Sequence, residues 1–232
     1  MRPCAQKLDT QTPCVKEAAT AAINTLASLG YSAVIFGGLA CSLYGAPRAP
    51  KDADILALPP SNEANTEDTE VLKNAIMRTD STRFYTVRAR DPGATYRVLY
   101  FRSDGHEPWK CKVDILLPGI LHLPALPTAR IVWIEGFPVI PFALLLLQKL
   151  QAYDDHRHSR EQHKFTRSQQ DEEDINKLLD IRERVLEVIQ EHPWHDRAVF
   201  SEEFMTLSRK RVAEYARIFI ETWLWRDLGF TI

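Results

Sequence analysis

The pattern of apolar residues along the chain changes close to residue 140. Before that point the apolar residues form short runs that are separated by polar, proline- or glycine-containing turns, a pattern typical of strands. Strands are expected over residues 33–36, 84–88, 95–102 and 109–116, with a hairpin made by residues 130–134 and 137–140. From Pro141 onward the apolar residues recur at helical spacing. We therefore predict an α+β protein: a mixed β-sheet flanked by helices in residues 1–140, then a helical bundle in residues 141–232.

Helical spacing and capping residues define the expected helices. Thr12 and Pro13 are typical of the N-cap and first position of a helix, and Gly30 is typical of a helix end. Further helices are expected over residues 39–44 and 69–77, from Pro141 onward, over an apolar stripe from 175 to 189, and over a stripe from 212 to 223. The polar stretch 153–170 is expected to be a solvated helix end or a loop.

The stretch AVIFGGLACSLYGAPRAPKDADIL holds the first candidate chemistry. An apolar strand ends at Gly37 and Gly38, a short helix follows, and a second strand carries Asp52 and Asp54. Because side chains alternate along a strand, the two aspartates face the same way, about 7 Å apart. Two carboxylates so placed repel each other unless cations lie between them, and Mg²⁺ prefers oxygen ligands. Free backbone N–H groups at a helix start favour phosphate.

A third carboxylate lies further along the chain, in WKCKVDILL. On the expected strand Asp114 shares a face with Lys112, opposite Val113 and Ile115. An unpaired carboxylate among apolar residues is costly, and a metal ion shared with Asp52 and Asp54 would remove that cost. The alternative is a salt bridge from Asp114 to a nearby base, for which the candidates are Lys110, Lys112 and Arg97.

The order of two glycines, a short helix, D-x-D and a later third carboxylate resembles the DNA polymerase beta-like nucleotidyltransferase superfamily. The resemblance implies transfer of a nucleoside monophosphate from a nucleoside triphosphate to an acceptor hydroxyl by a two-metal mechanism that uses Mg²⁺ or Mn²⁺ and releases pyrophosphate. Asp52, Asp54 and Asp114 would be the catalytic metal ligands. The nucleotide would be held by Gly37 and Gly38, with Arg48 and Lys149 as further candidates.

A second resemblance, to AbiEii-type and minimal nucleotidyltransferases, lies in the helical part. Their K-L-x-A element matches Lys149, Leu150 and Ala152, and their K-D-x-x-D-[IL] element matches Asp171, Asp174 and Ile175. Gln170 stands where the family has Lys, and Leu39 follows the glycines where many members have Ser. Taken together, the two resemblances cover roughly residues 15–190.

Several of these residues have plainer interpretations that the sequence leaves open. Lys149 either reaches the triphosphate or extends its ammonium to water. Asp171 and Asp174 are better explained as acidic residues in the first turn of a helix, where the dipole favours them. Arg48 either contacts phosphate or lies on the surface. A solvated segment explains the histidines of residues 156–163 better than a zinc site does.

Charge, cysteine spacing and hydropathy limit the partners and the cellular location that we expect. The formal net charge is −2 for 232 residues, so nucleic acid binding would require a local basic surface. The four cysteines have no metal-ligand spacing and are expected to be buried free thiols in a reducing compartment. No apolar stretch is long enough to span a membrane, and the expected location is cytoplasmic or nuclear. The sequence does not identify the acceptor of the nucleoside monophosphate, and RNA, including tRNA ends, is among the candidates. The rival function is a non-catalytic nucleotide-binding or protein-interaction module on the same fold.

Overall fold

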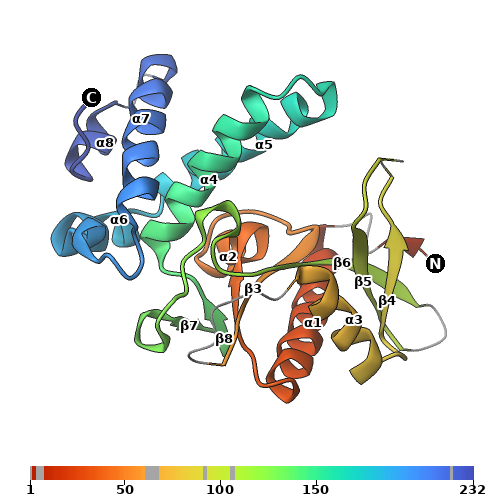
Figure 1. The fold of residues 1–232 in the computed structure, drawn as a ribbon. Coiled ribbons are helices and arrows are strands. Elements are labelled where there is room, and N and C mark those ends of the chain that lie inside the picture. Colours follow the sequence, from red (N-terminus) through yellow and green to blue (C-terminus); the bar gives the residue numbers. More distant parts are fainter. Residues whose placement is uncertain (1, 4–7, 61–67, 91–92, 105–107, 220–221) are drawn as a thin grey trace.

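A computed structural model describes residues 2–3, 8–60, 68–90, 93–104, 108–219 and 222–232. It shows a mixed β-sheet packed against helices, followed by a group of helices that leads to the C-terminus (Figure 1). The predicted fold class is confirmed.

The first part of the chain contains every strand that the described residues form. Its elements are β1 (Arg2–Pro3), α1 (Leu8–Ser28), β2 (Ser32–Phe36), α2 (Gly37–Leu43), β3 (Asp52–Leu58), α3 (Thr69–Thr79), β4 (Phe84–Arg88), β5 (Arg97–Arg102), β6 (Trp109–Leu116), the 3₁₀ turns Ile120–His122 and Thr128–Arg130, β7 (Val132–Ile134) and β8 (Phe137–Val139). Most of these elements match the expected ranges to within two residues. The first helix is the exception: it begins at Leu8 and includes Pro13, which the sequence placed at its start.

The second part is helical. Its elements are α4 (Phe142–Arg157), α5 (Gln162–Leu179), α6 (Arg182–Glu191), the 3₁₀ turn Pro193–His195, α7 (Glu202–Ile218) and α8 (Thr222–Asp227). The last strand thus ends just before the predicted boundary at residue 140, although the division into two domains stays a prediction.

Several expectations for the helical part are wrong or are confirmed only in part. The apolar stripe from 175 to 189 lies on two helices, because the chain turns between α5 and α6, and Leu186 is left exposed. The polar stretch 153–170 is largely helical, forming the end of α4 and the first half of α5. The stripe from 212 to 223 also lies on two helices, α7 and α8, and Trp223 at its end is exposed, whereas Trp225 is buried.

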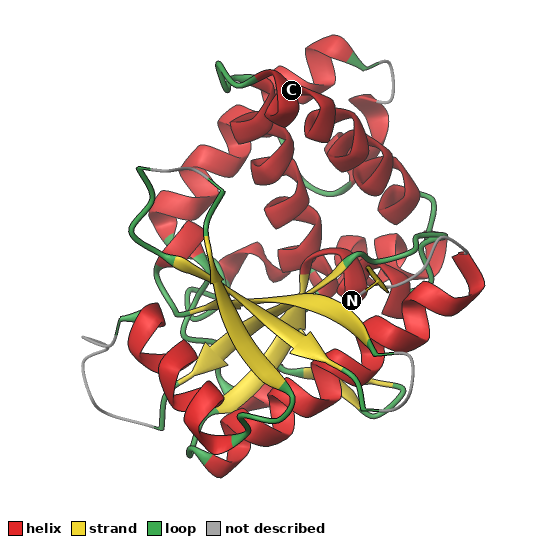
Figure 2. Cartoon of the chain, turned by 90° about the vertical axis from the view of Figure 1, so that its right-hand side faces the viewer, coloured by secondary structure: helices red, strands yellow, loops and turns green. Residues whose placement is uncertain are grey.

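The sheet has the strand order β4-β5-β6-β3-β2-β8-β7, and β1 pairs with the start of β6. The β3–β6 and β2–β8 pairs are parallel, and the β2–β3, β4–β5, β5–β6 and β7–β8 pairs are antiparallel. Figure 2 shows the twist of these strands, with the C-terminal helices gathered beyond one end of the sheet. Helices α1 and α3 pack against β6 and against each other, covering the face that carries Cys111, Val113 and Ile115.

The core explains why these segments fold as they do. The side chains of Val15, Ala18, Ala22 and Leu26 repeat at helical spacing on α1 and are fully buried against the sheet. Cys41 is a free, buried thiol whose pKa burial raises to about 12, and Cys111 is buried as well. Cys14 is also free, and Cys4 lies outside the described residues. No described helix combines the length and apolarity that crossing a bilayer requires.

Candidate functional site

Three carboxylates from two adjacent strands converge on the sheet face opposite α1. Asp52 and Asp54 lie on β3 and Asp114 lies on β6, and the parallel register places Asp54 directly beside Asp114. An oxygen from each of the three lies within 4.8 Å of the others. The geometric prediction for Asp114 is therefore confirmed: it comes within metal-sharing distance of two residues about sixty positions earlier in the sequence.

Strand alternation produces this arrangement. Ala53 and Ile55 on β3, like Val113 and Ile115 on β6, are buried in the core. Asp52, Asp54 and Asp114 alternate with these apolar residues, so their side chains must point to the other face of the sheet, where they are partly exposed. A shift of one residue in either strand would move the carboxylates to the core face, so the apolar residues fix the position of the site.

The three carboxylates make an electrostatically unfavourable group. Burial, followed by the charges of Asp52 and Asp114, raises the pKa of Asp54 to about 8. Burial and then the charge of Asp114 also raise the pKa of Asp52. Oxygen ligands that repel one another at this distance are the donor set that hard divalent cations prefer. These residues therefore fit Mg²⁺ or Mn²⁺.

Lys112 partly offsets the charge of this group. Its ammonium forms an ion pair with the Asp114 carboxylate, as one of the plainer interpretations of Asp114 expected. Both side chains of the pair remain more than a third exposed, and surface ion pairs of this kind contribute little. The ion pair and the three-carboxylate group thus exist together.

The glycines provide the space for Asp54. Gly37 has a positive φ of 63°, and a Cβ built on it would lie 2.0 Å from the Asp54 Oδ2 atom. The backbone N–H of Gly38 donates to that same oxygen, 3.3 Å away. Gly37 therefore has two reasons to be glycine, its backbone conformation and the close approach of the carboxylate.

A buried chain of charges connects this site to the helical part. Asp174 on α5 is fully buried, and its two oxygens lie 2.7 Å from Arg48 Nη1 and 2.8 Å from Lys149 Nζ. Lys149 also lies 3.7 Å from Asp171 Oδ1, and the second oxygen of Asp171 lies 2.6 Å from His156 Nδ1. Arg48 reaches back to the glycines, because its Nε would be 3.0 Å from a Cβ on Gly38.

These contacts overturn three of the plainer interpretations. Lys149 does not extend to water: the residue is only 8% exposed and paired inside the protein. Asp171 and Asp174 do not cap a helix, because α5 begins at Gln162 and both residues lie buried in its later turns. Arg48 is not a surface residue, since its side chain is 13% exposed. What all four do for a nucleotide stays a proposal.

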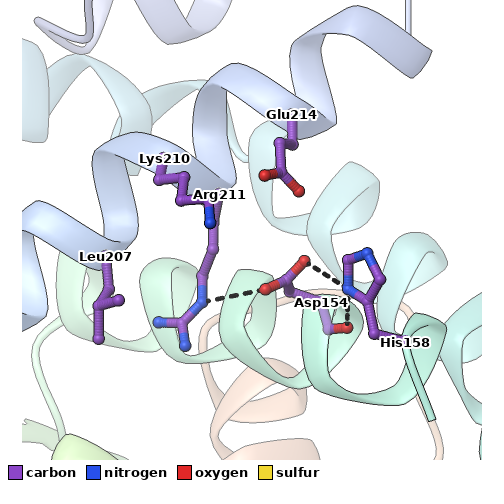
Figure 3. A pocket seen from close by; sticks show the side chains of 6 residues that line it. All are labelled: Asp154, His158, Leu207, Lys210, Arg211 and Glu214. Carbon is purple, nitrogen blue, oxygen red and sulfur yellow. Dashed lines mark hydrogen bonds and ion pairs between the residues drawn. The ribbon is translucent and has the colours of Figure 1, made fainter.

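A second group of potential metal ligands lies away from this site, on α4 and α7. Figure 3 shows Asp154, His158 and Glu214 around a cavity of about 320 Å³. No ligand partner for the histidine-rich segment was predicted, and Glu214 becomes a candidate partner only through the packing of α7 near α4. Arg211 Nε lies 3.5 Å from the Asp154 carboxylate, and Arg157 Nη2 lies 3.2 Å from Glu214. Arginine charge already balances this group.

The comparisons with known proteins support the fold. No family model matches the chain, and no curated protein does. An antigenic nucleotidyltransferase-like protein from Paracoccidioides brasiliensis is similar in structure with a TM-score of 0.58 at 16% identity, over 97% of this chain and 94% of that chain. The chain has the nucleotidyltransferase fold. JHP933 from Helicobacter pylori gives a TM-score of 0.43 at 18% identity, over 94% of this chain and 89% of that one. Of these two matches, the fold assignment rests on the first alone.

The nucleotidyltransferase fold brings together Asp52, Asp54, Asp114 and the two glycines, as the sequence predicted. Sequence reasoning missed the buried ionic chain. One signal was available, because the spacing of three between Asp171 and Asp174 puts both on one face of a helix. The partners of that face could not be read from the sequence.

Proposed function

We propose that this protein is a metal-dependent nucleotidyltransferase that moves a nucleoside monophosphate from a nucleoside triphosphate to an acceptor hydroxyl. The observation that carries the proposal is the convergence of Asp52, Asp54 and Asp114 within 4.8 Å, beside a glycine whose missing side chain admits Asp54. Burial and the neighbouring carboxylates raise the pKa of Asp54 to about 8 and also raise the pKa of Asp52, and a bound cation would offset the repulsion among these groups.

Asp52 and Asp54 would hold a first Mg²⁺ or Mn²⁺ with the triphosphate, and Asp114 with one of them a second. When bound, such ions neutralise phosphate charge and help to ionise the attacking hydroxyl. The acceptor oxygen forms a new bond to the α-phosphorus as the bond to the β-phosphate breaks. Pyrophosphate leaves, and the hydroxyl proton passes to the Asp114 carboxylate.

The positive charge around the triphosphate would come from both parts of the chain. The Arg48 guanidinium lies against Gly38, with Nε 3.0 Å and Nη2 3.2 Å from the position of a Cβ there, so its charge would act on a phosphate held beside the glycines. Lys149 is held by Asp174, and its charge acts on Asp54, whose pKa it lowers against the larger effects of burial and the other two aspartates. Gly37 and Gly38 supply backbone close to the phosphates.

We further propose kinship with AbiEii-type and minimal nucleotidyltransferases. The K-L-x-A element lies on α4 and the D-x-x-D element on α5, yet Lys149 of the first forms ion pairs with both aspartates of the second. Contact between the two elements supports the idea that they act as one unit.

The test is incubation of the protein with each α-labelled nucleoside triphosphate, Mn²⁺ and either total RNA or a protein extract. Asp54→Asn is the test variant, and Asp154→Asn, from the arginine-balanced group, is the matched control. Label transferred by the wild type and the control but not by Asp54→Asn supports the proposal. Mn²⁺ and triphosphate binding without transfer would favour the non-catalytic module. No binding of either would contradict both.

A further inference from the structure

The carboxylate face of the sheet continues outward as a row of aromatic and basic side chains. Tyr85 on β4 pairs with Tyr100 on β5, Tyr100 pairs with Lys112 on β6, and Lys112 pairs with Asp52 on β3. Because directly paired residues share a face, these four side chains form one line across four strands. We call it the tyrosine row. With strands about 4.8 Å apart, Tyr100 is roughly 10 Å and Tyr85 roughly 14 Å from Asp52.

Each tyrosine of the row is paired with a cation. The two rings are nearly parallel, with centroids 5.7 Å apart and planes 20° apart. The Lys110 ammonium lies 5.3 Å from the Tyr100 ring, and the Arg102 guanidinium lies 5.8 Å from the Tyr85 ring. Lys110 and Arg102 are themselves directly opposed across β5 and β6. The surface thus carries two copies of one unit, an aromatic ring with a positive charge beside it.

The helices that pack on β6, α1 and α3, cover the other face, and the residues of the row are partly exposed. A repeated ring and cation matches the repeat of a nucleic acid strand, in which each unit has a flat base and a phosphate. Single strands bind proteins by base stacking on aromatic rings and by phosphate contacts. Exposed cation–π contacts are weak, so incoming bases and phosphates can replace them.

We propose that the tyrosine row and its cations bind the 3′ end of a single-stranded RNA and direct its terminal hydroxyl to the carboxylates. RNA is favoured over DNA because RNA commonly presents unpaired ends with accessible bases. The tyrosine row ends at β6 and β3. An RNA strand that lies along the row therefore approaches the three carboxylates from the side of Asp114. This inference takes its chemistry from the proposed transferase, but the binding surface is testable without any reaction.

The experiment measures binding of a 5′-labelled single-stranded RNA by fluorescence anisotropy, without nucleotide or metal. Tyr100→Ala removes one stacking platform and is expected to weaken binding by about tenfold, within the range for loss of one stacked base. Tyr100→Phe keeps the ring and is expected to bind as the wild type does. Trp133→Ala, an exposed aromatic at the opposite edge of the sheet, is the matched control and is expected to change nothing.

The basic residues are tested by the salt dependence of the same binding. Lys110→Ala is expected to reduce the slope of log K against log salt by about 0.7, the value for one phosphate contact on a single strand. Lys16→Ala, on α1 and paired with Glu135, is the control and is expected to keep the wild-type slope.

In the binding assay, the inference would be overturned by wild-type binding that Tyr100→Ala does not weaken, by equal binding of duplex RNA, or by equal binding of single-stranded DNA. Label transferred only to protein in the acceptor assay would also overturn it. Binding of Mn²⁺ and triphosphate is measured in parallel to separate the two proposals. RNA binding without triphosphate binding would support the RNA-binding surface and contradict the transferase proposal. Triphosphate binding without RNA binding would contradict the RNA-binding surface alone.

Discussion

The chain builds two groups of metal-ligand residues, and they differ in how their charge is balanced. Asp52, Asp54 and Asp114 repel one another, and Lys112 is paired with only one of them. In the second group, His158 Nδ1 lies 3.1 Å from Asp154, and arginines lie beside both Asp154 and Glu214. In both groups three potential ligand atoms lie within 4.8 Å of one another. The difference indicates that a shortage of positive charge, more than the presence of ligands, marks the site that needs a metal ion.

The largest expected effect is on transfer in Asp54→Asn. The variant removes the charge of the carboxylate at the centre of the group, and we expect a loss of at least a thousandfold, or about 4 kcal/mol of transition-state stabilisation. Rates are measured by label transfer at saturating triphosphate. Asp154→Asn in the same assay is expected to keep the wild-type rate, and an equal loss in both variants would mean that the two groups do not differ.

The next effect concerns the ionic chain beneath the first group. Lys149→Ala leaves the buried Asp174 carboxylate without its ammonium, and we expect a loss of about 3–5 kcal/mol in the free energy of unfolding. Turnover is expected to fall by one to two orders of magnitude, about 1.4–3 kcal/mol. The free energy of unfolding is measured by denaturant unfolding and the turnover by label transfer, on one preparation of the variant.

The double variant Lys149→Met with Asp174→Asn separates the two roles of Lys149. The asparagine can still accept from Arg48, and His156 still pairs with Asp171, so stability is expected to recover in part while turnover stays low. Recovery of both would make Lys149 purely structural.

A smaller effect is expected on the pH dependence of stability. In the metal-free protein the pKa of Asp54 is raised from 3.8 to about 8, so between these values the folded state holds a proton that the unfolded state has lost. Stability is therefore expected to fall as the pH rises through this window. Mn²⁺ should raise the melting temperature more at pH 8 than at pH 5. A metal-free melting curve that does not change over this range would contradict the assigned repulsion.

The smallest effect is expected in the second group. Asp154 is partly exposed and shared among histidine and arginine side chains. Asp154→Asn is expected to cost no more than about 1 kcal/mol of stability, the upper end for surface ion pairs. The measurement is denaturant unfolding with and without Zn²⁺. A zinc-dependent rise in wild-type stability that the variant lacks would show that this group also binds metal.

The sequence predicted the carboxylate site because its determinants are local. Alternation fixes which face Asp52, Asp54 and Asp114 occupy, and the apolar residues between them fix the register. The ionic chain was not predictable in this way. Whether Lys149 meets water or Asp174 depends on how α4 packs against α5, and nothing in either segment specifies that contact. The start of α1 was misplaced because proline is typical of the first turn of a helix, whereas Pro13 is the sixth residue of α1, beyond that turn.

The most direct test of the account is calorimetric titration of Mn²⁺ into the protein with a non-hydrolysable triphosphate, comparing the wild type with Asp54→Asn and Asp154→Asn. We expect the wild type and Asp154→Asn to bind Mn²⁺ with the same affinity, and Asp54→Asn to bind it at least tenfold more weakly, because a carboxylate ligand has become neutral. Equal affinity in the wild type and Asp54→Asn would contradict the assignment of the metal site to Asp52, Asp54 and Asp114.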